Sequence, residues 1–237
     1  MKNRGFLLPP LIKGKLIKRY KRFLADIELE TGEKVTAHCP NSGSMTGCAM
    51  PGSQVWLSES DNPKRKYKYT WELVKTLETL IGINTQVPNK LVKQAIENNL
   101  IKELSDYENI RAEVKTSQHT RLDLVLQKEG RPNCYVEIKN CTLVENEVAM
   151  FPDAVTTRGQ KHLDELASLV SAGHRGVIFF LIQRMDAKLF KPAAMIDKVY
   201  SEKLKKVVNN GVEIITRDTS INTKMIEVRN SIPVELD

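Results

Sequence analysis

The sequence predicts a mixed α/β (α+β) protein, with a small β-barrel over residues 1–84 and helices around a mixed central sheet over 85–237. Short strand-like segments separated by Gly, Pro and Asn turns fill the first part, and helical periodicity begins near Pro88. At 237 residues and 41% hydrophobic content, the chain can form a sizeable core. No apolar run approaches the ~20 residues that span a bilayer, and the N-terminus lacks a secretory signal. We therefore expect a cytoplasmic protein without a membrane partner.

The first part alternates apolar and polar residues over short segments, as half-buried strands do. A Thr31-Gly32 turn indicates a hairpin, and Pro40 opens a loop rich in Gly, Ser and Asn. About five short strands in such a length favour a closed barrel of the oligonucleotide-binding (OB) type. The expected strands cover residues 11–20, 22–29, 34–39, 54–60, 69–76 and 79–84.

The second part alternates helices with strands. Apolar residues at helical spacing predict a helix from Asn89, which we expect to cap it, and Asp153 is expected to cap a longer helix. The apolar run 174–183 is typical of a strand buried on both faces, and its connection to 134–140 implies a parallel pair. The expected helices are 89–100, 154–172 and 197–209, and the expected strands are 109–115, 121–127, 134–140, 174–183 and 212–216.

Positive charge gathers in the first part. The net charge is +7, and residues 1–84 alone hold 14 Lys and Arg against 8 Asp and Glu. Aromatic residues lie among these cations, which suggests a surface that follows phosphates and stacks on bases, although a solvated basic face is the alternative. The residues predicted to contact nucleic acid here are Lys18, Arg19, Lys21, Arg22, Lys64, Arg65, Lys66, Tyr67 and Lys68.

Charged residues interrupt two apolar segments, RLDLVLQ and CYVEIKN. Alternation places Leu122 with the other leucines of its strand on one face, and Asp123 on the opposite face. In the next strand Glu137 and Lys139 share a face. If the strands pair through the turn between them, these three charged side chains converge on one patch.

Two carboxylates and an amine at one point suit metal-assisted phosphodiester cleavage. Asp123 and Glu137, with the backbone carbonyl of Ile138, could hold Mg²⁺ or Mn²⁺, because hard cations prefer oxygen ligands. Lys139 could position the attacking water or offset the charge that develops on the phosphate. The alternative is a solvated sheet face, on which such charges are common.

This arrangement resembles the PD-(D/E)xK nuclease superfamily, in which Asp123, Glu137 and Lys139 match the motif and Leu122 replaces its Pro. The segments "TAHCPNSGSMTGC", "SDNPKRKYKYTWELV", "CYVEIKN" and "FPDAVTTRGQKHLDEL" resemble the sugar fermentation stimulation protein family over nearly the whole chain. The resemblance implies an OB barrel joined to a nuclease-like domain that binds DNA.

Within that resemblance, Glu113 is a candidate additional metal ligand, or else an exposed acid paired with Lys115 or Arg111. Arg158, Gln160 and Lys161 follow the start of the long helix and are candidates to hold the scissile phosphate, or else ordinary exposed residues.

Several alternatives stay open. Histidines 38, 119, 162 and 174 are scattered, so we expect structural or surface roles, with His162 nearest the candidate site. The loop 40–47 is either a phosphate-binding nest or an irregular turn. Reduced thiols are favoured over a Cys39–Cys48 disulfide. A DNA-binding regulator with a silent site is the alternative to a nuclease, a sugar-binding protein has little support, and a homodimer is kept beside a monomer.

Overall fold

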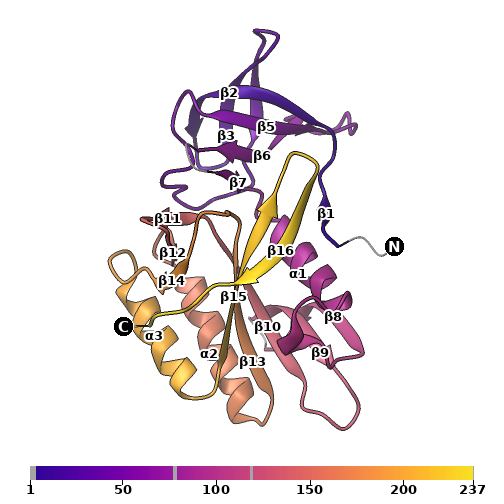
Figure 1. Ribbon diagram of the computed structural model, residues 1–237, viewed down its shortest axis with the longest axis vertical. Coiled ribbons are helices and arrows are strands. Elements are labelled where there is room, and N and C mark those ends of the chain that lie inside the picture. Colours follow the sequence, from indigo (N-terminus) through magenta and orange to yellow (C-terminus); the bar gives the residue numbers. More distant parts are fainter. Residues whose placement is uncertain (1–3, 77–78, 118–119, 237) are drawn as a thin grey trace.

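The computed structural model describes residues 4–76, 79–117 and 120–236. Figure 1 shows a β-barrel stacked on one edge of a larger α/β unit. The barrel strands are β2 (Leu11–Tyr20), β3 (Leu24–Leu29), β4 (Lys34–His38), β5 (Gln54–Glu59), β6 (Tyr69–Lys75) and β7 (Leu80–Gly82).

The barrel strands run in the order β4-β3-β2-β5-β6-β7. A parallel pairing of β4 with β6, at Ala37↔Tyr69 and His38↔Thr70, closes the sheet on itself. Closure removes the unpaired edges of an open sheet. Alternating residues fill the interior, among them Trp71, which is fully buried and donates its indole N–H to the carbonyl of Leu73 at 2.9 Å. The predicted small barrel is thereby confirmed.

The larger unit holds the second sheet, in the order β1-β16-β15-β13-β10-β9-β8. Strands β10, β13 and β15 are parallel neighbours, while the outer strands pair antiparallel. The predicted mixed sheet and its parallel central pair are confirmed. The strands are β1 (Phe6–Leu7), β8 (Asn109–Lys115), β9 (Arg121–Gln127), β10 (Cys134–Cys141), β13 (Arg175–Ile182), β15 (Glu213–Ile221) and β16 (Met225–Ser231). The helices are α1 (Val87–Glu97), a 3₁₀ turn (Lys102–Leu104), α2 (Thr157–Ser171) and α3 (Lys198–Asn209).

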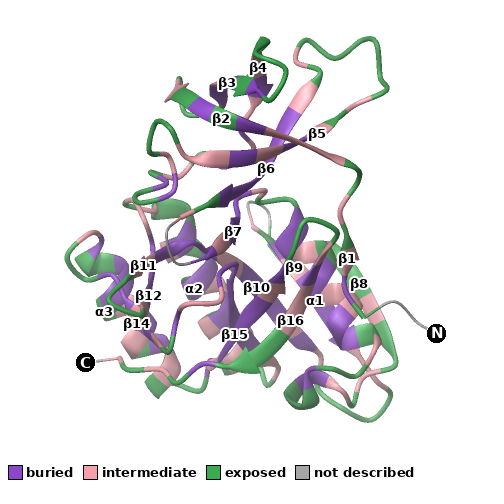
Figure 2. Cartoon of the chain, turned by 45° about the horizontal axis from the view of Figure 1, so that its top comes forward, coloured by how far each residue is buried: buried purple, intermediate pink, exposed green. Residues whose placement is uncertain are grey.

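Strand β13 contributes residues to the hydrophobic clusters on both faces of the large sheet. Val177 and Phe179 pack in the cluster beneath α1, whereas Ile178 and Phe180 pack in the cluster beneath α2 and α3. Buried residues follow the central strands in Figure 2, and exposed residues lie on loops and outer helix faces. A strand covered on both faces needs an almost continuous apolar sequence, which is why this segment could be predicted.

The barrel sits against the edge of the sheet where the parallel strands end. The backbone N–H of Gly82 in β7 donates to the carbonyl of Gln183, directly after β13, at 3.0 Å. Leu73 of the barrel is buried in the cluster beneath α1. In doubly wound folds this edge carries ligand sites, so the barrel covers the position where a site is expected.

Both predicted helix caps were wrong. Helix α1 begins at Val87, with Gln86 at its N-cap and no side-chain cap, so Asn89 lies inside the helix. Proline at the first turn explains the earlier start, because its missing N–H has no partner there anyway. Helix α2 is capped by Thr156, whose hydroxyl accepts from the N–H of Gly159 at 3.0 Å. Asp153 instead accepts from the N–H of Met45 in the barrel, at 3.1 Å.

Some short strands were not predicted. β1 pairs with β16 from the opposite end of the chain, so no local pattern predicts β1, whereas β16 is the missed second strand of a hairpin with β15. A separate sheet, β11-β12-β14, follows the end of β10 and comprises β11 (Leu143–Glu145), β12 (Val148–Phe151) and β14 (Leu189–Pro192). The cysteines at 39, 48, 134 and 141 are free and buried, as favoured from the sequence. In the described part of the chain, no helix has the length and apolar character to cross a membrane.

Substitution of Gly14 offers a test of how closely the barrel strands approach one another. It lies on β2 where that strand pairs with both β3 and β5, and an added Cβ would stand 2.7 Å from the backbone oxygen of Glu28. We expect Gly14→Ala to lower the free energy of unfolding by about 1–3 kcal/mol, because backbone cannot move aside cheaply. Urea unfolding measures this, with exposed Lys15→Ala as the neighbouring control. Equal effects of the two variants would contradict the tight approach of β3.

Candidate active site

The candidate site begins where β9 and β10 stop pairing. Their ladder runs from Cys134↔Leu126 to Val136↔Leu124. Beyond it, the backbone N–H of Ile138 donates to Oδ2 of Asp123 at 2.8 Å, so a side chain takes the place of the next strand partner. Because this bond fixes the Asp123 carboxylate at the gap between the strands, its position is set by the backbone.

A second bond holds the other oxygen of the same carboxylate. Asn89, in the first turn of α1, donates from Nδ2 to Oδ1 of Asp123 at 2.7 Å. The residue expected to cap α1 therefore ties this helix to the site. Asp123 is half-buried and bound through both oxygens.

Glu137 is the most deeply buried acid of the site, with 2% of its surface exposed. Its Oε1 accepts from Nζ of Lys139 at 2.6 Å and contacts Nδ1 of His162 on α2. Its Oε2 is buried and has no hydrogen-bond partner among the described residues. A buried carboxylate oxygen is costly when unpartnered, so this atom is the natural attachment point for a ligand that the site lacks on its own.

The hydrogen bond at the second nitrogen of the His162 ring indicates which of its nitrogens carries the proton. Nε of Arg158 donates to Nε2 of His162 at 3.4 Å, so this ring nitrogen is the acceptor. Nδ1 then carries the proton and donates to Glu137. Lys139 lies 3.3 Å from the same Nδ1. An Arg–His–Glu chain thus runs from the surface of α2 to the buried acid.

These side chains line a cavity of about 240 Å³, here called the Glu137 cavity. Asp123, Glu137 and Lys139 all face it, as predicted from strand alternation. Other members come from the start of α1, the end of β10 and the start of α2. They are Thr85, Pro88, Asn89, Ile138, Asn140, Arg158 and His162.

The two acids differ in charge state. Burial, together with the nearby charge of Glu137, raises the pKa of Asp123 to about 6. Burial also opposes ionisation of Glu137, but the hydrogen bond from His162 and the charge of Lys139 outweigh it and lower the pKa of Glu137. Asp123 therefore takes up a proton near pH 6, while Glu137 stays ionised.

Comparisons with known proteins identify the family. The family model "Sugar fermentation stimulation protein RE domain" matches residues 86–225, and "SfsA N-terminal OB domain" matches 17–83. The chain belongs to the sugar fermentation stimulation protein family. This confirms the resemblance noted in its sequence and the OB type of the barrel.

Relatives of this chain match it over almost their whole length. The homolog from Geotalea uraniireducens is 53% identical over 96% of this chain and 98% of its own. The homolog from Pelobacter propionicus is 54% identical over 97% and 99%. The structure of Pyrococcus furiosus SfsA in complex with Ca²⁺ matches with a TM-score of 0.90 at 26% identity, covering 98% of this chain and 99% of that one.

One predicted face in this family member was wrong. Leu122 was expected beside Leu124, but it packs in the cluster beneath α2, whereas Leu124 packs beneath α1. The alternation changes phase at Asp123, where the β10 ladder ends. On the other side, Glu113 of β8 stands opposite Asp123 without pairing, between the pairs Ala112↔Leu124 and Val114↔Leu122, and the register is the same before and after it. This unpaired level, with Glu113 at a positive φ, interrupts the alternation of faces without shifting the register.

Glu113 does not line the Glu137 cavity, but it lines the adjoining cavity together with Arg158 and His162. It has a positive φ of 56° at the β8 irregularity, and its carboxylate accepts from Arg121 at 3.1 Å on the exposed surface. Its partner thus differs from the Lys115 and Arg111 considered from the sequence. Within the described residues, no three His, Cys, Asp or Glu side chains gather closely enough to hold a metal ion by themselves.

The α2 residues separate into different roles. Arg158 reaches the Glu137 cavity, and exposed Lys161 lines an adjoining cavity of about 430 Å³. Gln160 turns away and donates to both oxygens of Asp197, the cap of α3, at 3.2 Å. The structure therefore places Gln160 in the α2–α3 junction and away from the candidate site.

The barrel arginines and lysines also divide. Arg19 donates to the carbonyls of Arg22, Asn41, Gly43 and Ser44, and so holds the loop that follows β4. Arg65 donates to the hydroxyl of Thr70 at 3.0 Å. These two guanidinium groups stabilise the barrel itself.

The lysines of the barrel form a second group. Lys18 pairs with Asp26 at 3.6 Å, and Lys68 pairs with Glu59. Lys66 lies 5.6 Å from the ring of half-buried Tyr67. Of the residues predicted to contact nucleic acid, Lys21, Arg22, Lys64 and Lys66 are exposed and form no ion pair with a described residue.

The loop 40–47 is an irregular turn. The N–H of Gly43 donates to Oδ1 of Asn41 at 2.8 Å, and the N–H of Met45 donates to Asp153. A carboxylate of the larger unit thus occupies an amide that a bound phosphate would need. This favours the turn over a phosphate nest.

Two site residues were missed or underrated. Asn89 reads locally as a helix cap, and nothing in the sequence links it to an acid 34 positions away. His162 was named but expected to be structural, although helical spacing from Arg158 did place both on one face of α2. His119 lies outside the described residues.

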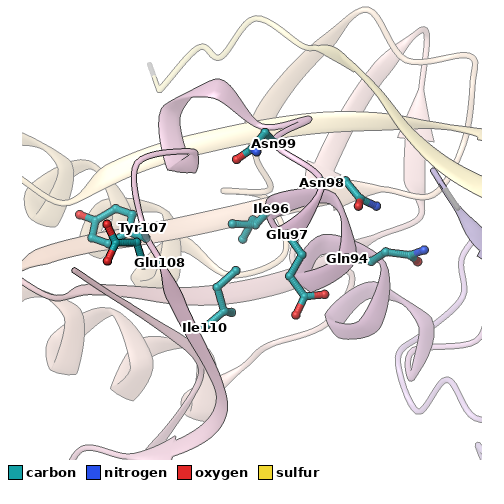
Figure 3. A pocket seen from close by; sticks show the side chains of 8 residues that line it. All are labelled: Gln94, Ile96, Glu97, Asn98, Asn99, Tyr107, Glu108 and Ile110. Carbon is teal, nitrogen blue, oxygen red and sulfur yellow. The ribbon is translucent and has the colours of Figure 1, made fainter. Parts of the chain in front are cut away.

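A larger cavity, of about 580 Å³, lies between the end of α1 and β8. Figure 3 shows Gln94, Glu97 and Asn98 on its helical side and Tyr107 and Glu108 on the other. Its lining includes two acids and no basic residue. A phosphate would be repelled there, so size alone does not identify the functional cavity.

The raised pKa of Asp123 predicts how stability changes with pH. The folded protein holds the Asp123 proton more tightly than the unfolded chain does, and this adds to the free energy of unfolding. The contribution is complete below the unfolded-state pKa near 4 and is lost as pH rises through about 6. Asparagine stays neutral, so Asp123→Asn should stabilise the fold at pH 8 by about 2–3 kcal/mol relative to its effect at pH 4. Urea unfolding across this range measures the difference.

The exposed acid Glu113 supplies the control, as Glu113→Gln, because its carboxylate lies outside the Glu137 cavity. An Asp123→Asn effect of the same size at every pH would contradict the raised pKa.

Proposed function

We propose that this protein binds nucleic acid, with DNA the favoured partner, and hydrolyses phosphodiester bonds with Mg²⁺ or Mn²⁺. The observation that carries the proposal is the convergence of Asp123, Glu137 and Lys139 on one cavity. This set combines oxygen ligands for a hard cation with an amine that can face a phosphate. Family membership is consistent with the proposal, but the family name describes no reaction.

The residues present fit a divalent cation. Asp123 offers a carboxylate fixed by two hydrogen bonds, and Glu137 offers the unpartnered Oε2. With the carbonyl of Ile138, they would form the protein part of the ligand shell, and water and phosphate would complete it. The Ca²⁺ complex of the Pyrococcus furiosus relative supports a hard-cation site in this fold. When bound, such a cation polarises a phosphate and lowers the pKa of a coordinated water.

The remaining side chains would act on the phosphate and the water. Lys139 lies beside Glu137, where its ammonium can orient the attacking water or balance charge on the phosphate. Arg158 stands at the start of α2 with its guanidinium toward His162, so the helix N-terminus and a cation point into the same region. His162 holds the Glu137 carboxylate in place through Nδ1. Each is thereby fixed before substrate arrives.

A second function is a DNA-binding protein of the same fold that does not cleave. Two observations favour it: Lys139 and His162 both contact Oε1 of Glu137, and among the described residues no three His, Cys, Asp or Glu side chains gather closely enough to hold a metal ion. The acid pair is then partly neutralised by the protein itself. On this reading, the site would bind a phosphate without turning it over.

A cleavage panel separates the two functions. Supercoiled, linear, branched and single-stranded DNA, and RNA, are incubated with Mg²⁺, with Mn²⁺, or with chelator. We expect cleavage only with metal, and a loss of at least about 100-fold in Asp123→Ala and Lys139→Ala, because each removes charge needed in the transition state. DNA affinity should change little.

Glu129→Ala is the matched control, since this exposed acid lies in the turn between β9 and β10 and lines neither cavity, and it should cleave normally. Cleavage that persists in Asp123→Ala would mean a different site or a contaminant. Binding without cleavage on every substrate would support the second function.

The barrel cations give a test of binding alone. Replacing Lys64 and Lys66 by Ala removes two exposed cations that have no ion-pair partner among the described residues. We expect about tenfold weaker DNA binding at low salt and a salt slope smaller by about 2, one for each lost phosphate contact. Fluorescence anisotropy across salt concentrations measures both quantities.

The control removes two cations from α3, Lys205 and Lys206, which belong to the larger unit and not to the barrel. Equal losses in both double variants would mean that net charge, and not the barrel loop, governs binding.

A further inference from the structure

A second cavity, of about 310 Å³, lies between the barrel and the larger unit. We call it the interdomain cleft. The barrel contributes Arg22, Asn41 and Ser42, and the larger unit contributes Asn140 and Phe151, among others. Its volume falls at the lower end of the ~300–1,000 Å³ typical of small-ligand pockets. The cleft belongs to neither unit alone.

The cleft adjoins the Glu137 cavity. Thr85 and Asn140 line both, so a strand of nucleic acid with its phosphate in one can reach the other. Asn140 follows Lys139 directly along β10. The two cavities therefore share part of their walls.

Contacts between the two units hold the cleft open. The N–H of Met45 donates to Oδ2 of Asp153 at 3.1 Å, and the hydroxyl of Thr85 donates to the carbonyl of Pro40 at 2.8 Å. Gly43 packs directly on the Asp153 carboxylate, with no space for a larger side chain. Because both walls are fixed, a ligand pays little to order them.

The walls offer oriented hydrogen-bond donors. Oδ1 of Asn140 accepts from Gln183 at 2.8 Å, and Oδ1 of Asn41 accepts from the N–H of Gly43 at 2.8 Å. The two oxygens are thus committed, and neither Nδ2 group donates to a described residue. Amide donors held in this way match the carbonyl and ring-nitrogen acceptors of a nucleobase.

The same cleft offers a cation. Arg22 lines it, is exposed and makes no ion pair with a described residue. Its guanidinium can meet the next phosphate. Phe151 also lines the cleft, but its ring packs on Phe180 and Tyr200, so the amide donors and Arg22 would hold the nucleotide.

We propose that the interdomain cleft binds one unpaired nucleotide of the substrate strand, next to the scissile phosphate. A paired base is stacked and bonded in the duplex, so only a single-stranded or flipped nucleotide can enter. The inference rests on the proposed nucleic-acid function and names its substrate class: strands with unpaired bases at the cut.

The test fills the cleft from each wall. Ser42→Trp enters from the barrel side and Val155→Trp from the larger unit, since both residues are exposed and line the cleft. Ser44→Trp, exposed on the same loop but outside the cleft, is the control. Thermal unfolding confirms that each variant folds. Affinities for a labelled single strand and for its duplex are measured by anisotropy in Ca²⁺, and a deoxynucleoside 5′-monophosphate is titrated separately.

We expect the parent to prefer the single strand, and each cleft variant to lose about tenfold of that affinity, because the added ring fills the space of the nucleotide and removes one or two of its hydrogen bonds. Duplex affinity and the Ser44→Trp variant should stay within about twofold of the parent. Unchanged single-strand affinity in both cleft variants, or equal losses for strand and duplex, would overturn the inference while leaving the proposed function intact. A monophosphate that binds the cleft without any single-strand preference would also overturn it. Absence of all nucleic-acid binding would refute the proposed function itself.

Discussion

The bond from the backbone N–H of Ile138 to the Asp123 carboxylate is the constraint on which the candidate site depends. Strands β9 and β10 part after Val136, and a buried amide left without a partner would cost about 1–3 kcal/mol. Asp123 satisfies that amide and is thereby fixed at the gap, facing the cavity that Glu137 also lines. The gap between the strands and the position of the acid therefore depend on each other. If the two strands paired regularly here, the carboxylate would lose its bond to the Ile138 N–H.

Glu137 imposes a second condition, because a buried charge is tolerated only when it is compensated. Lys139 and His162 compensate it at Oε1, while Oε2 remains without a partner among the described residues. Two ionised acids near one another, with one oxygen that no described residue satisfies, make this site less stable than an apolar core would be. A natural chain retains such a cost where function needs it. A bound cation would remove both the repulsion and the unsatisfied atom.

Strand period and charge position were enough to predict that Asp123, Glu137 and Lys139 meet, because adjacent strands repeat every second residue. The same rule failed for Leu122, since the unpaired level at Glu113 and Asp123 interrupts the alternation of faces. Asn89 could not be assigned, because a cap and a distant hydrogen bond leave the same local sequence. The long apolar strand and the closed barrel were predictable from composition, whereas β1 required a partner from the opposite end of the chain.

The hydrogen bonds of the barrel change the interpretation of its basic residues. Arg19 was expected to meet phosphate, yet its guanidinium holds the carbonyls of the loop that carries Asn41 and Ser42. Positive charge here shapes a wall of the interdomain cleft instead of contacting a ligand directly. Arg22, three residues later, lines the same cleft, and its guanidinium makes no ion pair with a described residue. Since charge focused near a cleft attracts phosphate more effectively than charge spread over a surface, this division would guide a strand toward the acids.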